Sequence, residues 1–119
     1  MHHSHFEMVY NQITEGIKIK VSRKDDEVVM TEIVFKKGAL FPEHIHLSDH
    51  SGYLLKGRIR ISREGNSAVM QEGDSWCIGK RISHFTEAIE DSVVIEVYSP
   101  DENDFEKKLK MESAELNHA

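Results

Sequence analysis

The feature that most constrains this chain is a stretch from Gly38 to Gly57 in which histidines recur at even spacing. His44, His46 and His50, three of the eight histidines, are separated by two and four positions. Because successive side chains of an extended strand point to opposite faces, even spacing sends these imidazoles to one face. The stretch therefore predicts a strand-rich fold that presents several histidines on one side of a sheet.

Most of the remaining chain carries the two-residue alternation of half-buried strands. Ile17–Ser22 alternates apolar with polar residues, and Val28–Lys36 is rich in β-branched and aromatic residues. Further strands are predicted over residues 53–55, 58–62, 67–71, 75–78, 84–88 and 92–98. Turn signals recur about every eight to twelve residues, which is typical of an all-β sandwich or barrel.

The C-terminus departs from this alternation. Ser99 is placed to cap a helix that begins at Pro100, and Glu102 is placed to complete a capping box, so we expect a helix over about 100–113. A chain of 119 residues fits one domain. We therefore expect an N-terminal arm over 1–16, a barrel over 17–99, and a C-terminal helix and tail over 100–119.

Composition excludes several classes of protein. A net charge of −6 and a pI near 5.7 argue against a nucleic-acid or anionic-membrane surface, which needs a concentrated basic face. No apolar run approaches the ~20 residues of a membrane span, and no export signal is recognisable at the N-terminus. The single Cys77 cannot form an internal disulfide and is expected to be a small buried residue. These observations favour a cytoplasmic protein.

Four histidines are the candidate metal ligands: His44, His46, His50 and His84. His84 begins a predicted strand that an antiparallel barrel can bring alongside the first three. Neutral imidazoles suit Zn, Fe, Ni or Cu and are poor ligands for Mg or Ca. We therefore expect a divalent transition metal such as Zn, Fe, Ni or Mn. The alternative is that these are ordinary surface and turn residues. The N-terminal His2, His3 and His5 are read as an incidental histidine-rich end, with a metal trap as the alternative.

Glycine spacing decides between these alternatives. The spacing resembles the first motif of the cupin family: Gly38, five residues, His44, one residue, His46, three residues, His50, six residues, Gly57. It also resembles the second motif of the family: Gly73, ten residues, His84. The resemblance implies a double-stranded β-helix, or jelly roll, over roughly residues 17–104. It also implies that the four histidines converge on one divalent metal inside the barrel mouth. Because jelly rolls of this size often cover an edge strand with a second copy, we expect a homodimer.

The chain departs from the family pattern at several positions. His50 stands where the family usually has Glu or Gln, and Gly79, Arg81 and Ala88 replace the usual Pro, Gly and Asn of the second motif. Four neutral histidines leave a divalent ion with about two net positive charges instead of one, which favours an anionic ligand. The competing hypothesis is that Asp49 binds the ion while His50 points away.

Glu96 and Tyr98 are the candidate catalytic residues. Both share the expected inner face of the last strand with Val94. The segment from Val94 to Phe105 resembles the end of small cupins that open the ring of unsaturated uronates in pectin breakdown, where an acid, an aromatic residue and an Arg serve the substrate. Glu96 and Tyr98 match the first two, but Glu102 stands where the Arg is expected.

Two functional classes therefore remain open. In the first, the protein is an enzyme acting on a small oxygenated, sugar- or keto-acid-like substrate, or an Fe(II)-dependent dioxygenase. In the second, it is a non-catalytic small-molecule or metal-binding module. Glu96 facing the metal cavity favours the enzyme, and a site closed by Trp76 and Phe85 favours the binding module. These two aromatic residues are expected to serve packing or a subunit interface rather than substrate stacking.

Overall fold

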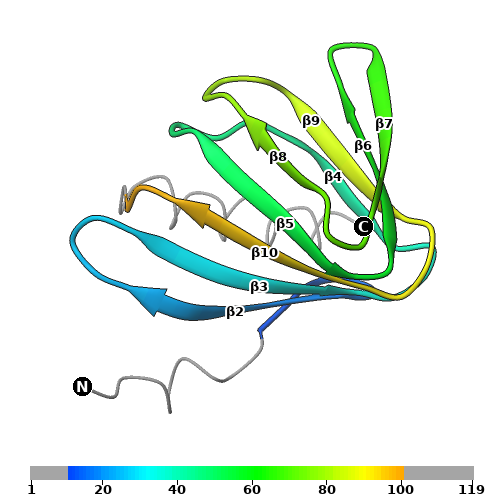
Figure 1. The fold of residues 1–119 in the computed structure, drawn as a ribbon, viewed down its shortest axis with the longest axis horizontal. Helices are drawn as coiled ribbons and strands as arrows, with labels where there is room; N and C mark the ends of the chain where they lie inside the picture. Colours follow the sequence, from blue (N-terminus) through cyan, green and yellow to red (C-terminus); the bar gives the residue numbers. More distant parts are fainter. Residues whose placement is uncertain (1–10, 101–119) are drawn as a thin grey trace.

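The computed structural model describes residues 11–100, which form ten strands in two antiparallel sheets (Figure 1). The strands are β1 (Asn11–Thr14), β2 (Ile17–Lys24), β3 (Val29–Phe35), β4 (Leu40–His44), β5 (His50–Lys56), β6 (Arg58–Arg63), β7 (Asn66–Gln71), β8 (Ser75–Ile78), β9 (His84–Ala88) and β10 (Ser92–Tyr98). One sheet has the order β1-β2-β3-β10-β5-β8 and the other β4-β9-β6-β7. The predicted all-β jelly-roll fold is confirmed.

The space between the sheets is filled by side chains that alternate along the strands. In β3, every second residue from Val29 to Phe35 is buried, as the sequence pattern predicts. The largest fully buried apolar side chains include Ile17, Leu54 and Ile59, which lie in strands of both sheets. Burying one such side chain contributes about 1.5–3 kcal/mol, so this alternation supplies much of the stability of the fold.

The predicted strands from residue 17 onward are confirmed, but other expectations are not. β1, in the segment expected to be an arm, and β4 were not predicted as strands. Residues 45–49 form a loop, although the even spacing of the histidines was interpreted as an extended strand. The histidine-rich end and the C-terminal helix lie outside the described residues, and the domain boundaries stay a prediction. The expectation that Cys77 is buried is wrong: Cys77 is exposed because β8 turns its neighbour Ile78 inward. Within residues 11–100, no helix is long and apolar enough to cross a membrane.

The turn at Gly57 joins β5 to β6 and rests on the turn that precedes β10. Gly57 has a φ of 97°, and a Cβ at this position would overlap the carbonyl oxygen of Asp91 and the hydroxyl of Ser92. The Ser92 hydroxyl accepts a hydrogen bond from the Arg58 amide at 3.1 Å and lies 2.8 Å from the carbonyl oxygen of Glu90. Contact between these two turns therefore leaves room only for glycine at position 57.

We predict that Gly57→Ala lowers the free energy of unfolding by roughly 3 kcal/mol or more, because left-handed strain and overpacking add. The matched control is Gly73→Ala, since Gly73 has a φ of 91° but no neighbouring atom within 4 Å of an added Cβ. That control is expected to cost only about 1–2 kcal/mol. Denaturant unfolding of both variants measures the difference, and equal losses would contradict the role given to the turn contact.

Candidate metal centre

His44 and His84 come from neighbouring strands that end at the same mouth of the barrel. His44 is the last residue of β4 and His84 the first of β9, and the two are directly paired across the antiparallel ladder. Their ring centroids are 4.4 Å apart. The strand register therefore brings together two histidines that are forty positions apart in the sequence.

Backbone carbonyl groups orient both rings. The Nδ1–H of His44 donates to the carbonyl oxygen of Pro42 at 2.7 Å, and the Nδ1–H of His84 donates to that of Ile82 at 3.1 Å. A neutral imidazole that donates from Nδ1 carries its lone pair on Nε2. Hydrogen bonds of this kind are the usual support of metal-binding histidines, since they fix both the tautomer and the ring orientation.

His46 completes a cluster of three. It lies in the loop between β4 and β5, its side chain is 1% exposed, and its Nε2 is 3.1 Å from the Nε2 of His44. Two nitrogens bound about 2.0–2.1 Å from one ion at octahedral or tetrahedral angles lie about 2.8–3.4 Å apart. Ring nitrogens of His44, His46 and His84 lie within 4.8 Å of one another, so the three residues can hold a metal ion. The donor set fits the divalent transition metals that imidazole prefers.

His50 lies beside this cluster but outside the group of three. Its ring stacks on His46 with centroids 3.5 Å apart and on Tyr98 with centroids 4.2 Å apart. Its Nδ1 lies 3.3 Å from Oε1 of Glu96. When the Nδ1–H of His50 donates to this carboxylate, the lone pair of the imidazole is on Nε2. That Nε2 atom is buried. The assignment of His50 as a fourth ligand stays a prediction.

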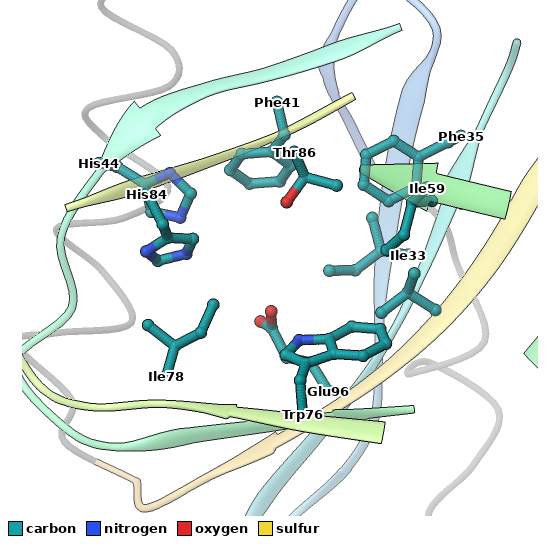
Figure 2. Close-up of a pocket in the computed structure, with 11 residues that line it drawn as sticks. Ile33, Phe35, Phe41, His44, Ile59, Trp76, Ile78, His84, Thr86 and Glu96 are labelled. Atoms are coloured by element: carbon teal, nitrogen blue, oxygen red, sulfur yellow. The ribbon is translucent and has the colours of Figure 1, made fainter. Parts of the chain in front are cut away.

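Glu96 and Tyr98 lie on the inner face of β10, as expected from their parity with Val94. The Glu96 side chain is 13% exposed and lines a cavity of about 20 Å³ together with His44 and His84. Figure 2 shows the two imidazoles on one side of this cavity, with Glu96 and Trp76 on the other. The structure therefore places a carboxylate in the same cavity as two of the three clustered histidines.

Trp76 forms the wall of the cavity because Gly52 makes room for it. Gly52 lies on β5 between Glu96 of β10 and Trp76 of β8, and is paired with both. A Cβ on Gly52 would overlap the indole ring. The sequence reasoning missed Gly52, although its even spacing from His50 already placed it on the inner face. Phe85, by contrast, is half-buried on the face of β9 opposite to His84 and does not line the cavity.

Nearby acidic residues are held away from the cluster. Oδ1 of Asp49 accepts a hydrogen bond from the Lys80 amide at 2.8 Å, and Oε2 of Glu43 accepts one from the Ser83 hydroxyl at 2.6 Å. Neither carboxylate belongs to the group that can hold a metal among the described residues. The hydrogen bond of Asp49 stabilises the loop before β9. It gives no support to the hypothesis that Asp49, instead of His50, binds the metal ion.

In the loop before β9, which departs from the family pattern, one residue keeps a backbone conformation that favours glycine. Arg81, which stands where the family usually has Gly, has a φ of 64°. Its amide donates to the carbonyl oxygen of His46 at 2.8 Å. The loop before β9 therefore holds the backbone of the histidine loop in place, at the expense of a left-handed non-glycine residue.

Comparisons with known proteins identify the family. Residues 31–98 match the family described as "Cupin domain" (Cupin_2), and the chain belongs to this family. It is 30% identical over 101 residues to the pectin degradation protein KdgF of Dickeya dadantii (strain 3937), an alignment that covers 83% of this chain and 92% of that protein.

Solved structures agree with this assignment. KdgF from a Halomonas species superposes with a TM-score of 0.75 at 26% identity, covering 82% of this chain and 92% of that chain. An RmlC-like cupin from Shewanella frigidimarina NCIMB 400 gives a TM-score of 0.75 at 25% identity, covering 82% of this chain and 87% of that chain. The chain is thus a cupin that resembles KdgF over most of its length.

We predict that protein purified without a tag contains one divalent transition-metal ion per chain. The double variant His44→Ala/His46→Ala is expected to lose at least about nine-tenths of this metal, because two of the clustered imidazoles are removed. Elemental analysis measures the content. The matched control replaces His2, His3 and His5 by Ala and is expected to retain the ion. Metal content that is unchanged in the double variant would show that the cluster is not the site.

Proposed function

We propose that this cupin is an enzyme that acts on a small oxygenated, sugar- or keto-acid-like substrate at a divalent metal held by His44, His46, His50 and His84. The single observation that carries the proposal is the position of Glu96, whose carboxylate lines the same cavity as His44 and His84. An acid–base residue within reach of a metal-bound substrate is what isomerisation or ring opening requires. When bound, the metal polarises an oxygen of the substrate.

The protein side chains then have separate roles. Glu96 takes a proton from the substrate and returns it at another atom. His50 orients the Glu96 carboxylate through its Nδ1, 3.3 Å away, and the stacked rings of His46 and Tyr98 restrict the rotation of His50. A carboxylate that is 13% exposed is shielded from water, which strengthens its electrostatic interactions with the reacting group.

Two observations support an acidic substrate of this kind. The relative from Dickeya dadantii is named for pectin degradation, and pectin is built of sugar acids. The imidazoles of the proposed site are neutral ligands, so they leave the positive charge of the ion available to an anion. We therefore propose unsaturated uronates as the substrates to test first.

The size of the cavity favours a second candidate. A volume of about 20 Å³ holds roughly one water molecule, so the cavity fits dioxygen or a single water better than a sugar acid. An Fe(II)-dependent dioxygenase and a non-catalytic metal-binding module are therefore the alternatives. For the uronate reaction, the Trp76 side chain has to move away from the cavity when substrate enters.

The proposal includes a cytoplasmic homodimer. Tyr53 and Leu55, on the outer face of β5, are 44% and 54% exposed, and a second copy packed on this face would bury them. We predict that sedimentation of the wild-type chain gives twice the monomer mass of 13.7 kDa. Tyr53→Glu/Leu55→Glu is expected to sediment as a monomer, whereas a monomeric wild type would contradict the proposal.

We predict that Glu96→Gln lowers kcat for ring opening of an unsaturated uronate by about 10²–10⁴-fold, because general acid–base catalysis is lost. The metal content is expected to stay at the wild-type value. Loss of the ultraviolet absorbance of the conjugated double bond measures turnover. The matched control is Glu43→Gln, an outward-facing carboxylate beside His44, and it is expected to be fully active. Absence of turnover by the metal-loaded wild type would favour the binding module instead.

A further inference from the structure

A second cavity of about 120 Å³ lies on the other side of Trp76 and Ile78 from the first. It is lined by the residues of the β6–β7 hairpin and the adjacent β8, namely Ile61, Arg63, Asn66, Ser67, Ala68, Met70, Trp76 and Ile78. In Figure 1 the β6–β7 hairpin projects at the upper right, at the edge of the four-stranded sheet. We call this space the Arg63 cavity. Its position makes Trp76 the partition between it and the candidate metal centre.

Arg63 is the cation of this cavity and lies next to the histidine cluster. It is paired with His84 across the antiparallel ladder of β6 and β9, where paired Cα atoms are about 4.5–5.5 Å apart. Its side chain leaves β6 on the same face as Ile59 and Ile61, which are buried between the sheets. Arg63 itself is exposed, so its side chain lies at the solvent end of this inner face, at the mouth of the barrel.

The other two arginines of β6 have partners on the outer face, but Arg63 does not. Arg58 forms an ion pair with Glu90 at 2.7 Å and Arg60 one with Glu87 at 3.1 Å. Arg63 forms no ion pair with any residue of the part of the chain that the structure describes. Its positive charge is therefore available to an anion.

One hydrogen bond holds the guanidinium group in position. Nη1 of Arg63 donates to the carbonyl oxygen of Cys77 at 2.7 Å, so the side chain spans from the four-stranded sheet to β8 of the other sheet. The remaining N–H donors of the planar group are left for a ligand, and such a fork matches a carboxylate in two-point contact. The tight turn at Glu64 and Gly65, with φ values of 49° and 81°, pairs Arg63 with Asn66 at the rim of the cavity.

We propose that the Arg63 cavity is the subsite that binds the carboxylate of the substrate, with the side chain of Asn66, the ladder partner of Arg63, as an additional donor. The inference rests on the function proposed above and names the group that recognises an acidic substrate. A sugar acid whose carboxylate binds Arg63 directs its hydroxyl and carbonyl oxygens past Trp76 toward His84 and Glu96. In a chain of net charge −6, an unpaired cation beside the metal centre supplies the local attraction that an anion needs.

The test compares an anionic with a neutral sugar. Calorimetric titration of the metal-loaded protein with D-galacturonate and with D-galactose is expected to give about tenfold tighter binding of the acid, as one charge-assisted contact provides. Arg63→Gln is expected to abolish this preference, and Arg63→Lys to restore part of it. The matched control Arg60→Gln removes a cation from the outer face of the same strand and is expected to keep the full preference.

Fluorescence of Trp76, the single tryptophan, reports whether the ligand reaches the partition between the cavities. A wild-type protein that binds the two sugars equally or binds neither, or an unchanged preference in Arg63→Gln, would overturn the subsite. Failure of the proposed function gives a different result. In that case the metal-loaded protein turns over no unsaturated uronate, but the preference for the acid that depends on Arg63 is still present. Thermal unfolding of each variant verifies that lost preference does not come from lost folding.

Discussion

The antiparallel pairing of β4 with β9 is the constraint on which the rest of the site depends. It places His44 directly beside His84, and the loop that follows β4 returns His46 to the same point, with its Nε2 3.1 Å from that of His44. A shift of this register by one residue would turn one of the histidines to the outer face. The core residues of the same strands oppose such a shift, because it would also expose them to water.

The two sheets contribute different chemistry to the mouth of the barrel. The four-stranded sheet supplies His44, His84 and Arg63, whereas the six-stranded sheet supplies Glu96, Tyr98 and His50. Backbone carbonyl groups orient two of the clustered rings, those of His44 and His84, and His50 lies in hydrogen-bond contact with the Glu96 carboxylate. Arg63 and Glu96 lie on different sheets and line different cavities, so the positive and the negative group are kept apart.

Most of the fold and much of the site were predictable from local patterns, and the failures have physical reasons. The alternation in β3 and β10 gave the inner faces correctly, including Glu96 and Tyr98. Cys77 was misassigned because a four-residue strand offers too short an alternation to choose a face. Gly52 was missed because its role depends on the indole ring of Trp76, which only the pairing of β5 with β8 brings against it. The role of His50 depends on the ring stacking, which involves three separate segments of the chain.

The sequence by itself determined the family, most of the strands and which histidines are candidate ligands, because glycine spacing and two-residue alternation are local properties of an extended chain. Only the tertiary structure decided which histidines form the tight group, that Glu96 lines their cavity, and that Arg63 lies paired with His84. These facts depend on the register between strands far apart in the sequence. Between such strands the register is fixed by packing in the core, whereas a local turn fixes it only within a hairpin.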